Sequence, residues 1–269
     1  MAKLMTTVDS EPRETPAPST TARVLALLCS LAESENGSSV RALAQQTGMS
    51  RSATHRTLQI MAEEGFVTKD EQTSRYTVGH KLIQVAARVL SGSSLVGLAD
   101  EVMARLVHAT GETAYLAMFV PNEKFSTFVH RVECSKPLRY VVPVGMKMPL
   151  HTGAAGKAIL AACDEKAVGQ LDLLAHTSIS PDALPRLQTE LKEIRERGFA
   201  TSIEEQLEGA AGVAAPIYTS KYVAGSLTLT VPVNRIPETG LEVLGPFVRR
   251  SAQELSQLLE NSPQSMIGR

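Results

Sequence analysis

The chain has 269 residues, of which 43% are hydrophobic, and its 27 lysines and arginines nearly balance its 28 aspartates and glutamates. This length suggests two domains, and the apolar content is sufficient for ordinary hydrophobic cores. The sequence shows neither a signal peptide nor a long apolar run, so we expect a cytoplasmic protein without a membrane partner, and three widely spaced cysteines with no CxxC pair argue against a structural zinc site or a disulfide framework.

The first predicted helix begins near Thr20. Residues 1–19, which precede it, are rich in Thr, Pro, Glu and Ser and have no apolar period, which predicts a disordered tail. The helix is predicted to end at Asn36-Gly37, and its apolar stripe consists of Val24, Leu25, Leu27, Leu28 and Leu31. Cys29 lies within this stripe, so we expect it to fill part of the core.

Two short amphipathic helices separated by a turn at Gly48 come next, which is the layout of a helix-turn-helix. Gly48 can adopt the positive φ that ends the first helix, and Ser50 is a suitable N-cap for the second. We expect Ala53, Leu58 and Met61 to point inward. The opposite face can reach both phosphates and base edges of double-stranded DNA, and it carries Arg51, Ser52, His55, Arg56 and Gln59.

Two β-prone runs, 66–69 and 74–79, flank a polar tip and predict a hairpin that would serve as a wing, with Lys69 and Arg75 as its cations. From Arg41 to Arg88, seven cations against four acids leave a charge of +3. This excess is modest, so we expect a dimer that adds two weakly basic surfaces and binds DNA less tightly as salt rises. The alternative is a small helical hairpin with a solvated charged face.

Downstream of the wing the pattern becomes mixed. Residues 80–90 predict an amphipathic linker helix, which Ser91-Gly92-Ser93-Ser94 interrupts. Further helices are predicted over 95–108, 156–162, 185–197 and about 240–260, and strands over 114–120, 127–132, 138–142, 211–218 and 223–231, with a turn at 121–124. Strands, then helices, then strands again indicate an α+β domain with an antiparallel sheet.

Two motifs in the second half carry a resemblance. Residues 149–158 read Pro-Leu-His-Thr-Gly-Ala-Ala-Gly-Lys-Ala, and Arg197-Gly198-Phe199-Ala200 is followed by Glu204-Glu205, Gly209 and Val213-Ala214-Ala215-Pro216-Ile217-Tyr218. With the order of winged helix-turn-helix, linker helix and α+β domain, they resemble the IclR family of bacterial transcriptional regulators from about Thr20 to Glu260. The expected parts are a tail at 1–19, a DNA-binding domain at 20–79, a linker helix at 80–94, an effector-binding domain at 95–260 and a flexible tail at 261–269.

The resemblance implies a homodimer, or a pair of dimers, that binds promoter DNA, and a GAF-like second domain that holds a small organic effector. The positions that match the family's effector pocket are Ala154, Ala155, Ser202, Gly212, Thr228 and Thr230. Ser202 stands where the family often has an acid, and Gly212 where it often has a cysteine. We therefore expect a roomier, less negative pocket, and an aromatic carboxylate held by hydroxyls and by backbone N–H groups at the helix start after Gly153.

Other chemistry is weakly indicated. No nucleophile with a base and an orienting acid can be assembled around His151, so we expect a structural or pocket-rim histidine and no enzyme. Residues 153–157 lack the spacing of a phosphate loop, and Glu204, Glu205 and Glu208 are expected to form a solvated face rather than a metal site. We expect no cofactor. The alternative function is an enzyme or small-molecule carrier domain tethered to a nucleic-acid-binding module.

Overall fold

A computed structural model describes residues 19–34, 36–92, 94–119, 125–163, 183–220 and 222–261. The chain divides into two compact units, with the division between Val89 and Leu90. Apart from Ser19 and Asn261, the predicted tails at 1–19 and 261–269 lie outside the described residues, as does the predicted turn at 121–124. No helix within the described ranges is long and apolar enough to cross a bilayer.

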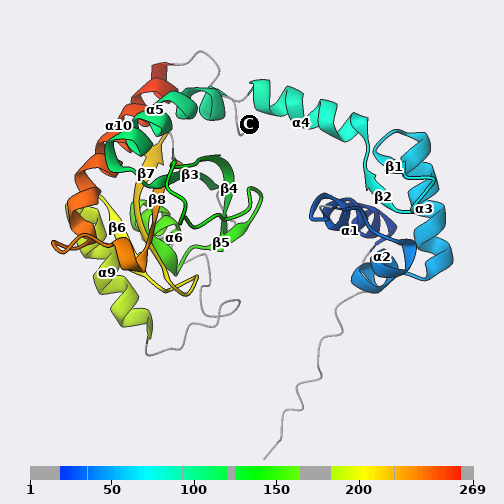
Figure 1. Ribbon diagram of the computed structural model, residues 1–269, viewed down its shortest axis with the longest axis horizontal. Coiled ribbons are helices and arrows are strands. Elements are labelled where there is room, and N and C mark those ends of the chain that lie inside the picture. The colour runs from blue at the N-terminus through cyan, green and yellow to red at the C-terminus, as the bar shows by residue number, and fades with distance from the viewer. Residues whose placement is uncertain are drawn as a thin grey trace, which may run out of the picture. The chain divides into compact units, whose positions relative to one another are not determined.

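The first unit is a winged helix-turn-helix (Figure 1). Its elements are α1 (Thr20–Ala32), α2 (Val40–Thr47), α3 (Arg51–Glu63), β1 (Val67–Lys69) and β2 (Tyr76–Val78), and α4 (His80–Gly92) begins in this unit and continues past its last residue, Val89. The predicted caps are confirmed, since Gly48 ends α2 at φ 66° and the Ser50 hydroxyl accepts a hydrogen bond from the amide of Ala53 at the start of α3. These local signals position α3 after a tight turn.

A compact apolar cluster holds these helices to the hairpin, and it consists of Leu27, Leu31, Leu43, Leu58, Met61, Val67 and Tyr76. Two expectations about this core are wrong. Cys29 is exposed, because it lies on the side of α1 away from the cluster, as does Leu25. On α3 the residue that points inward is Thr54 rather than Ala53, and the Thr54 hydroxyl bonds to the carbonyl of Ser50.

The wing is tied back to the loop that precedes α2. Tyr76 pairs with Ser38, and the Arg75 guanidinium donates to the carbonyl of Gly37 at 3.0 Å. Gly37 has φ 69°, and a Cβ there would lie 2.8 Å from the carbonyl oxygen of Tyr76. Only glycine therefore allows the loop and β2 to approach this closely.

The second unit is built on one six-stranded antiparallel sheet in the order β5-β4-β3-β8-β7-β6. The strands are β3 (Thr113–Phe119), β4 (Phe125–Val132), β5 (Lys147–Pro149), β6 (Ala200–Ile203), β7 (Ala210–Tyr218) and β8 (Val223–Pro232). The helices are α5 (Ser94–Thr110), α6 (Gly153–Ala162), α9 (Ala183–Arg197) and α10 (Gly245–Asn261), with 3₁₀ turns η1 (Val233–Arg235) and η2 (Leu241–Leu244). The predicted α+β class is confirmed.

Helices cover both faces of this sheet (Figure 1). On one face α5 and α10 pack over an apolar core to which β7 and β8 contribute Val213, Leu227 and Leu229. On the other face α6 packs against β7 and β8, with α9 outside it. Because strand side chains alternate, Gly212, Thr228 and Thr230 face the α6 side.

Three details differ from the sequence prediction. Residues 138–142 are not a strand, because side chains bind their backbone: the Tyr115 hydroxyl accepts from the amide of Val142 at 2.8 Å and donates to the carbonyl of Tyr140 at 3.1 Å. Strands β5 and β6 were not predicted. The last helix begins at Gly245 rather than near Gly240, since Pro246 suits only the first turn of a helix and residues 241–244 form η2.

Candidate DNA-binding face and effector pocket

The outer side of α3 presents all five of the residues predicted to face DNA. Arg51, Ser52, His55, Arg56 and Gln59 are each exposed. Their positions repeat at helical spacing, so they form one face, and the apolar residues Leu58 and Met61 lie opposite it in the core. Two arginines with a histidine, a serine and a glutamine can contact phosphates and hydrogen-bond to base edges in a major groove.

The wing presents its two predicted cations differently. Lys69 ends β1, and its Nζ lies 3.5 Å from a carboxylate oxygen of Glu71, an exposed ion pair that phosphates can replace. Arg75 is exposed but also binds the Gly37 carbonyl. At the tip, Asp70 accepts from the amides of Thr73 and Gln72, and these backbone hydrogen bonds lower the pKa of Asp70. The tip is therefore held in a defined turn.

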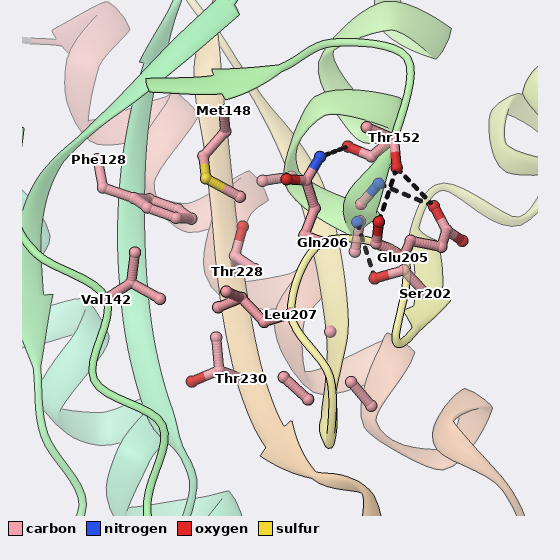
Figure 2. Close-up of a pocket in the computed structure, with 16 residues that line it drawn as sticks. Phe128, Val142, Met148, Thr152, Ser202, Glu205, Gln206, Leu207, Thr228 and Thr230 are labelled. Carbon is pink, nitrogen blue, oxygen red and sulfur yellow. Dashed lines mark hydrogen bonds between the residues drawn. The ribbon is translucent and has the colours of Figure 1, made fainter. Parts of the chain in front are cut away.

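A pocket lies on the α6 face of the sheet and encloses about 480 Å³, including its open mouth. It is lined by all six positions that match the family's effector pocket, which come from the start of α6, from β6, from β7 and from β8: Ala154, Ala155, Ser202, Gly212, Thr228 and Thr230 (Figure 2). These positions are separated by up to 76 residues in the chain, and the fold brings them to one cavity.

The N-terminus of α6 forms the polar end of this pocket. The amide of Ala154 donates to the Ser202 hydroxyl at 3.0 Å, and the amide of Gly153 donates to a carboxylate oxygen of Glu205 at 2.8 Å (Figure 2). The first amides of a helix have no partner within the helix and attract negative charge. Glu205 and Ser202 therefore satisfy donors at which an external anion could bind.

Glu205 also forms an ion pair with a buried lysine. Its other carboxylate oxygen lies 2.6 Å from Nζ of Lys157, whose side chain is only 3% exposed. Lys157 binds Glu190 of α9 at the same distance of 2.6 Å. Glu204, Glu205 and Glu208 are all exposed, as expected of a solvated face, but one of them, Glu205, also binds Lys157 and the first amide of α6. Its carboxylate lines the pocket, so the pocket is not free of negative charge.

The opposite end of the pocket is apolar. Phe128, Val142, Met148 and Leu207 line it (Figure 2). The ring of Tyr115 packs against that of Phe128, with 4.9 Å between the ring centroids. Burial raises the pKa of Tyr115, whose hydroxyl is committed to the backbone at Tyr140 and Val142. This wall suits a flat hydrocarbon body.

Between the two ends lies a hydroxyl without a partner. Thr228 is 3% exposed, and no hydrogen-bond partner for its Oγ1 is found among the described residues. A buried hydroxyl without a partner is costly, so such a group in a pocket marks a place where a ligand can bind. Thr230 differs, because its hydroxyl donates to the carbonyl of Thr113 at 3.5 Å.

Sequence reasoning missed the apolar wall and Glu205. Phe128 lies on β4, far from either motif, and the pairing of β4 with β5 brings it to the cavity beside Met148, which immediately precedes the first motif. Glu205 stands in the second motif and Lys157 in the first. The signal available in the sequence was that these two motifs carry opposite charges that could pair. His151, also in the first motif, does not line the pocket, and burial lowers its pKa.

Both parts of the chain match models of one known protein family. Residues 20–71 match the IclR helix-turn-helix domain, and residues 87–257 match the C-terminal domain of the bacterial transcriptional regulator IclR. The chain is 30% identical to the acetate operon repressor of Salmonella typhimurium over 239 residues, which is 87% of each protein.

Solved structures agree. The IclR of Thermotoga maritima is 26% identical, with a TM-score of 0.69 over 90% of this chain and 98% of the other. An IclR homologue of Microbacterium hydrocarbonoxydans, complexed with 4-hydroxybenzoate, is 19% identical, with a TM-score of 0.78 over 91% of this chain and 100% of the other, and it shares the fold. The chain thus belongs to the IclR family of bacterial transcriptional regulators.

Proposed function

We propose that this chain binds promoter DNA sequence-specifically and that a small organic effector, a carboxylate or an aromatic acid, changes its affinity for that DNA. The observation that carries the proposal is the convergence of Ala154, Ala155, Ser202, Gly212, Thr228 and Thr230 on one pocket, in a chain whose other unit is a winged helix-turn-helix. The 4-hydroxybenzoate complex of the Microbacterium hydrocarbonoxydans homologue supports the aromatic class.

In this proposal residues 20–79 bind DNA, residues 80–94 form the linker helix and residues 95–260 bind the effector, between tails at 1–19 and 261–269. Arg51, Ser52, His55, Arg56 and Gln59 read the major groove, and Lys69 and Arg75 contact the backbone from the wing. A homodimer, or a pair of dimers, adds two such surfaces. The effector changes DNA affinity only to the extent that it binds the two arrangements of the dimer unequally.

The test is fluorescence anisotropy of the purified protein with a labelled duplex from its own upstream intergenic region, against a scrambled duplex of equal length at fixed salt. Tight binding to the first duplex alone, altered by an organic acid, is the expected result. Equal weak binding to both duplexes, together with turnover of the acid, would favour the tethered enzyme or carrier instead.

A further inference from the structure

The N-terminus of α6 is occupied by a carboxylate that the chain itself supplies. We propose that an acidic effector binds by exchange with Glu205: the effector carboxylate takes the place of the Glu205 carboxylate at the amide of Gly153, and the loop from Glu204 to Gly209 is released. This inference rests on the proposed function, because it requires that the pocket bind an organic acid.

Charge balance favours exchange over simple addition. Lys157 is buried between Glu190 and Glu205, so this corner carries one positive and two negative charges. An added effector carboxylate would make the net charge beside the same helix terminus more negative, from −1 to −2, and none of the described lining residues is a cation. Like charges at such distances repel strongly when partly buried. Exchange keeps the net charge at −1 and leaves Lys157 paired with Glu190.

The pocket also has a hydrogen-bonding position that the chain does not fill. Thr228 Oγ1 is buried, lines the same cavity and has no partner among the described residues. Its hydroxyl can donate to the oxygen of a bound acid, an interaction that Glu205 does not already make. An effector at this position therefore gains a contact that the resident carboxylate lacks, and this gain favours its entry.

Exchange would release the loop because Glu205 provides the charge-assisted bonds that join the loop to α6. Other bonds between the loop and its surroundings are neutral, among them those from Gln206 Nε2 to the carbonyl of Thr152 at 3.3 Å and from the Tyr140 hydroxyl to the carbonyl of Glu208 at 2.6 Å. Neutral hydrogen bonds are weaker than bonds to a carboxylate. Leu207, which lines the apolar end, would move with the loop.

The test compares four acids with their amides by isothermal titration calorimetry: acetate, pyruvate, benzoate and 4-hydroxybenzoate against acetamide, pyruvamide, benzamide and 4-hydroxybenzamide. Glu205→Gln keeps the shape and an acceptor for Gly153 but removes the competing charge. We expect the best acid to bind this variant about tenfold more tightly than the wild type, while its amide does not bind more tightly. Glu208→Gln is the matched control, because it removes the same charge from an exposed position on the loop and should leave both affinities unchanged.

A reporter separates exchange from a general electrostatic effect. The chain contains no tryptophan, so Glu208→Trp places a single tryptophan, which can be excited apart from the tyrosines, on the loop. The acid should shift its emission and the amide should not. Equal acid affinity in wild type and Glu205→Gln, or a reporter that does not respond to bound acid, would overturn exchange while leaving the proposed effector site intact. Failure of every acid to bind either protein would overturn both the exchange and the acidic class of effector.

Discussion

Lys157 and Glu205 link the two motifs of the effector unit through an ion pair of 2.6 Å between Nζ and a carboxylate oxygen. Lys157 projects from α6, and Glu205 belongs to the loop that follows β6, so the pair fixes the helix that forms the polar end of the pocket to the loop that lines its mouth. The contact therefore stabilises the fold around the pocket and holds Glu205 at the site where the proposed effector would bind.

Replacing Lys157 with methionine should destabilise the effector unit, because it leaves Glu190 and Glu205 without their shared cation. Breaking a buried ion pair costs about 3–5 kcal/mol, and the partial exposure of the two glutamates reduces this to about 2–3 kcal/mol. Urea unfolding followed by circular dichroism measures the loss. Lys192→Met, an exposed position on α9, is the control, and a similar loss in both variants would contradict the role of the ion pair.

Thr228→Val should separate stability from binding. The substitution removes a buried hydroxyl that has no described partner, so the free energy of unfolding should rise by about 1 kcal/mol. The same variant should bind the effector acid more weakly in calorimetry, because the hydroxyl that would contact the acid is lost. Thr228→Ser keeps the hydroxyl and should retain binding. Weaker folding of the valine variant would show that the hydroxyl has a partner.

Arg56→Ala and Lys69→Ala should weaken DNA binding in different ways. Arg56 lies on the exposed face of α3, so its loss should reduce affinity for the specific duplex more than for a scrambled one. Lys69 lies on the wing, so its loss should weaken both complexes similarly and flatten the dependence of affinity on salt. Anisotropy titrations at several salt concentrations measure both effects. The same loss of affinity on both duplexes for both variants would contradict this division.

His151 should make the effector unit sensitive to mild acid. Burial lowers its pKa below the usual 6.5, so the unfolded chain takes up a proton at a higher pH than the folded chain. The neutral, buried imidazole of His151 thus contributes to the free energy of unfolding. This contribution is fully present above pH 6.5 and is lost as the pH falls toward and through the lowered pKa of the folded state. His151→Gln should therefore lose less stability than the wild type between about pH 7.5 and 5.5 in urea titrations. The exposed His108→Gln should behave as the wild type.

The two glycines that flank α2 should differ in their tolerance of a side chain. Gly48 has φ 66°, and a Cβ added there would have no neighbouring atom within 4 Å, whereas a Cβ at Gly37 would meet the carbonyl oxygen of Tyr76 at 2.8 Å. Gly48→Ala should cost about 1 kcal/mol for the backbone alone, and Gly37→Ala at least about twice that. Thermal unfolding of the two variants compares them. Equal losses would argue against the close approach of the loop and β2.

Much of the first unit could be predicted because its signals are local. Ser50 and Gly48 act within a few residues of themselves, so cap and turn could be read from sequence. Periodicity gives the direction of an apolar stripe but not how far the neighbouring elements cover it. For that reason the pattern on α1 wrongly predicts a core position for Cys29, which lies on the side of α1 away from the apolar cluster and is exposed.

The misassigned segments of the second unit depend on distant partners. Residues 138–142 have the composition of a strand, but the Tyr115 hydroxyl and the Arg131 guanidinium bind their backbone in place of a neighbouring strand. The resemblance supplied six positions that line the pocket, whereas Phe128 and Glu205 reach it through strand pairing and an ion pair. Such contacts join residues far apart in the chain, and no short pattern encodes them.

The alternation along β8 gives adjacent residues unrelated selective constraints. Thr228 faces the pocket, while Leu227 and Leu229 on either side of it lie in the core beneath α5 and α10. A substitution at position 228 therefore changes the lining of the pocket and leaves the core beneath α5 and α10 unchanged, whereas a substitution at position 227 or 229 changes that core and leaves the lining unchanged. If the pocket binds the proposed effector, we expect single substitutions on this side of β8 to change its ligand specificity without rearranging the strand.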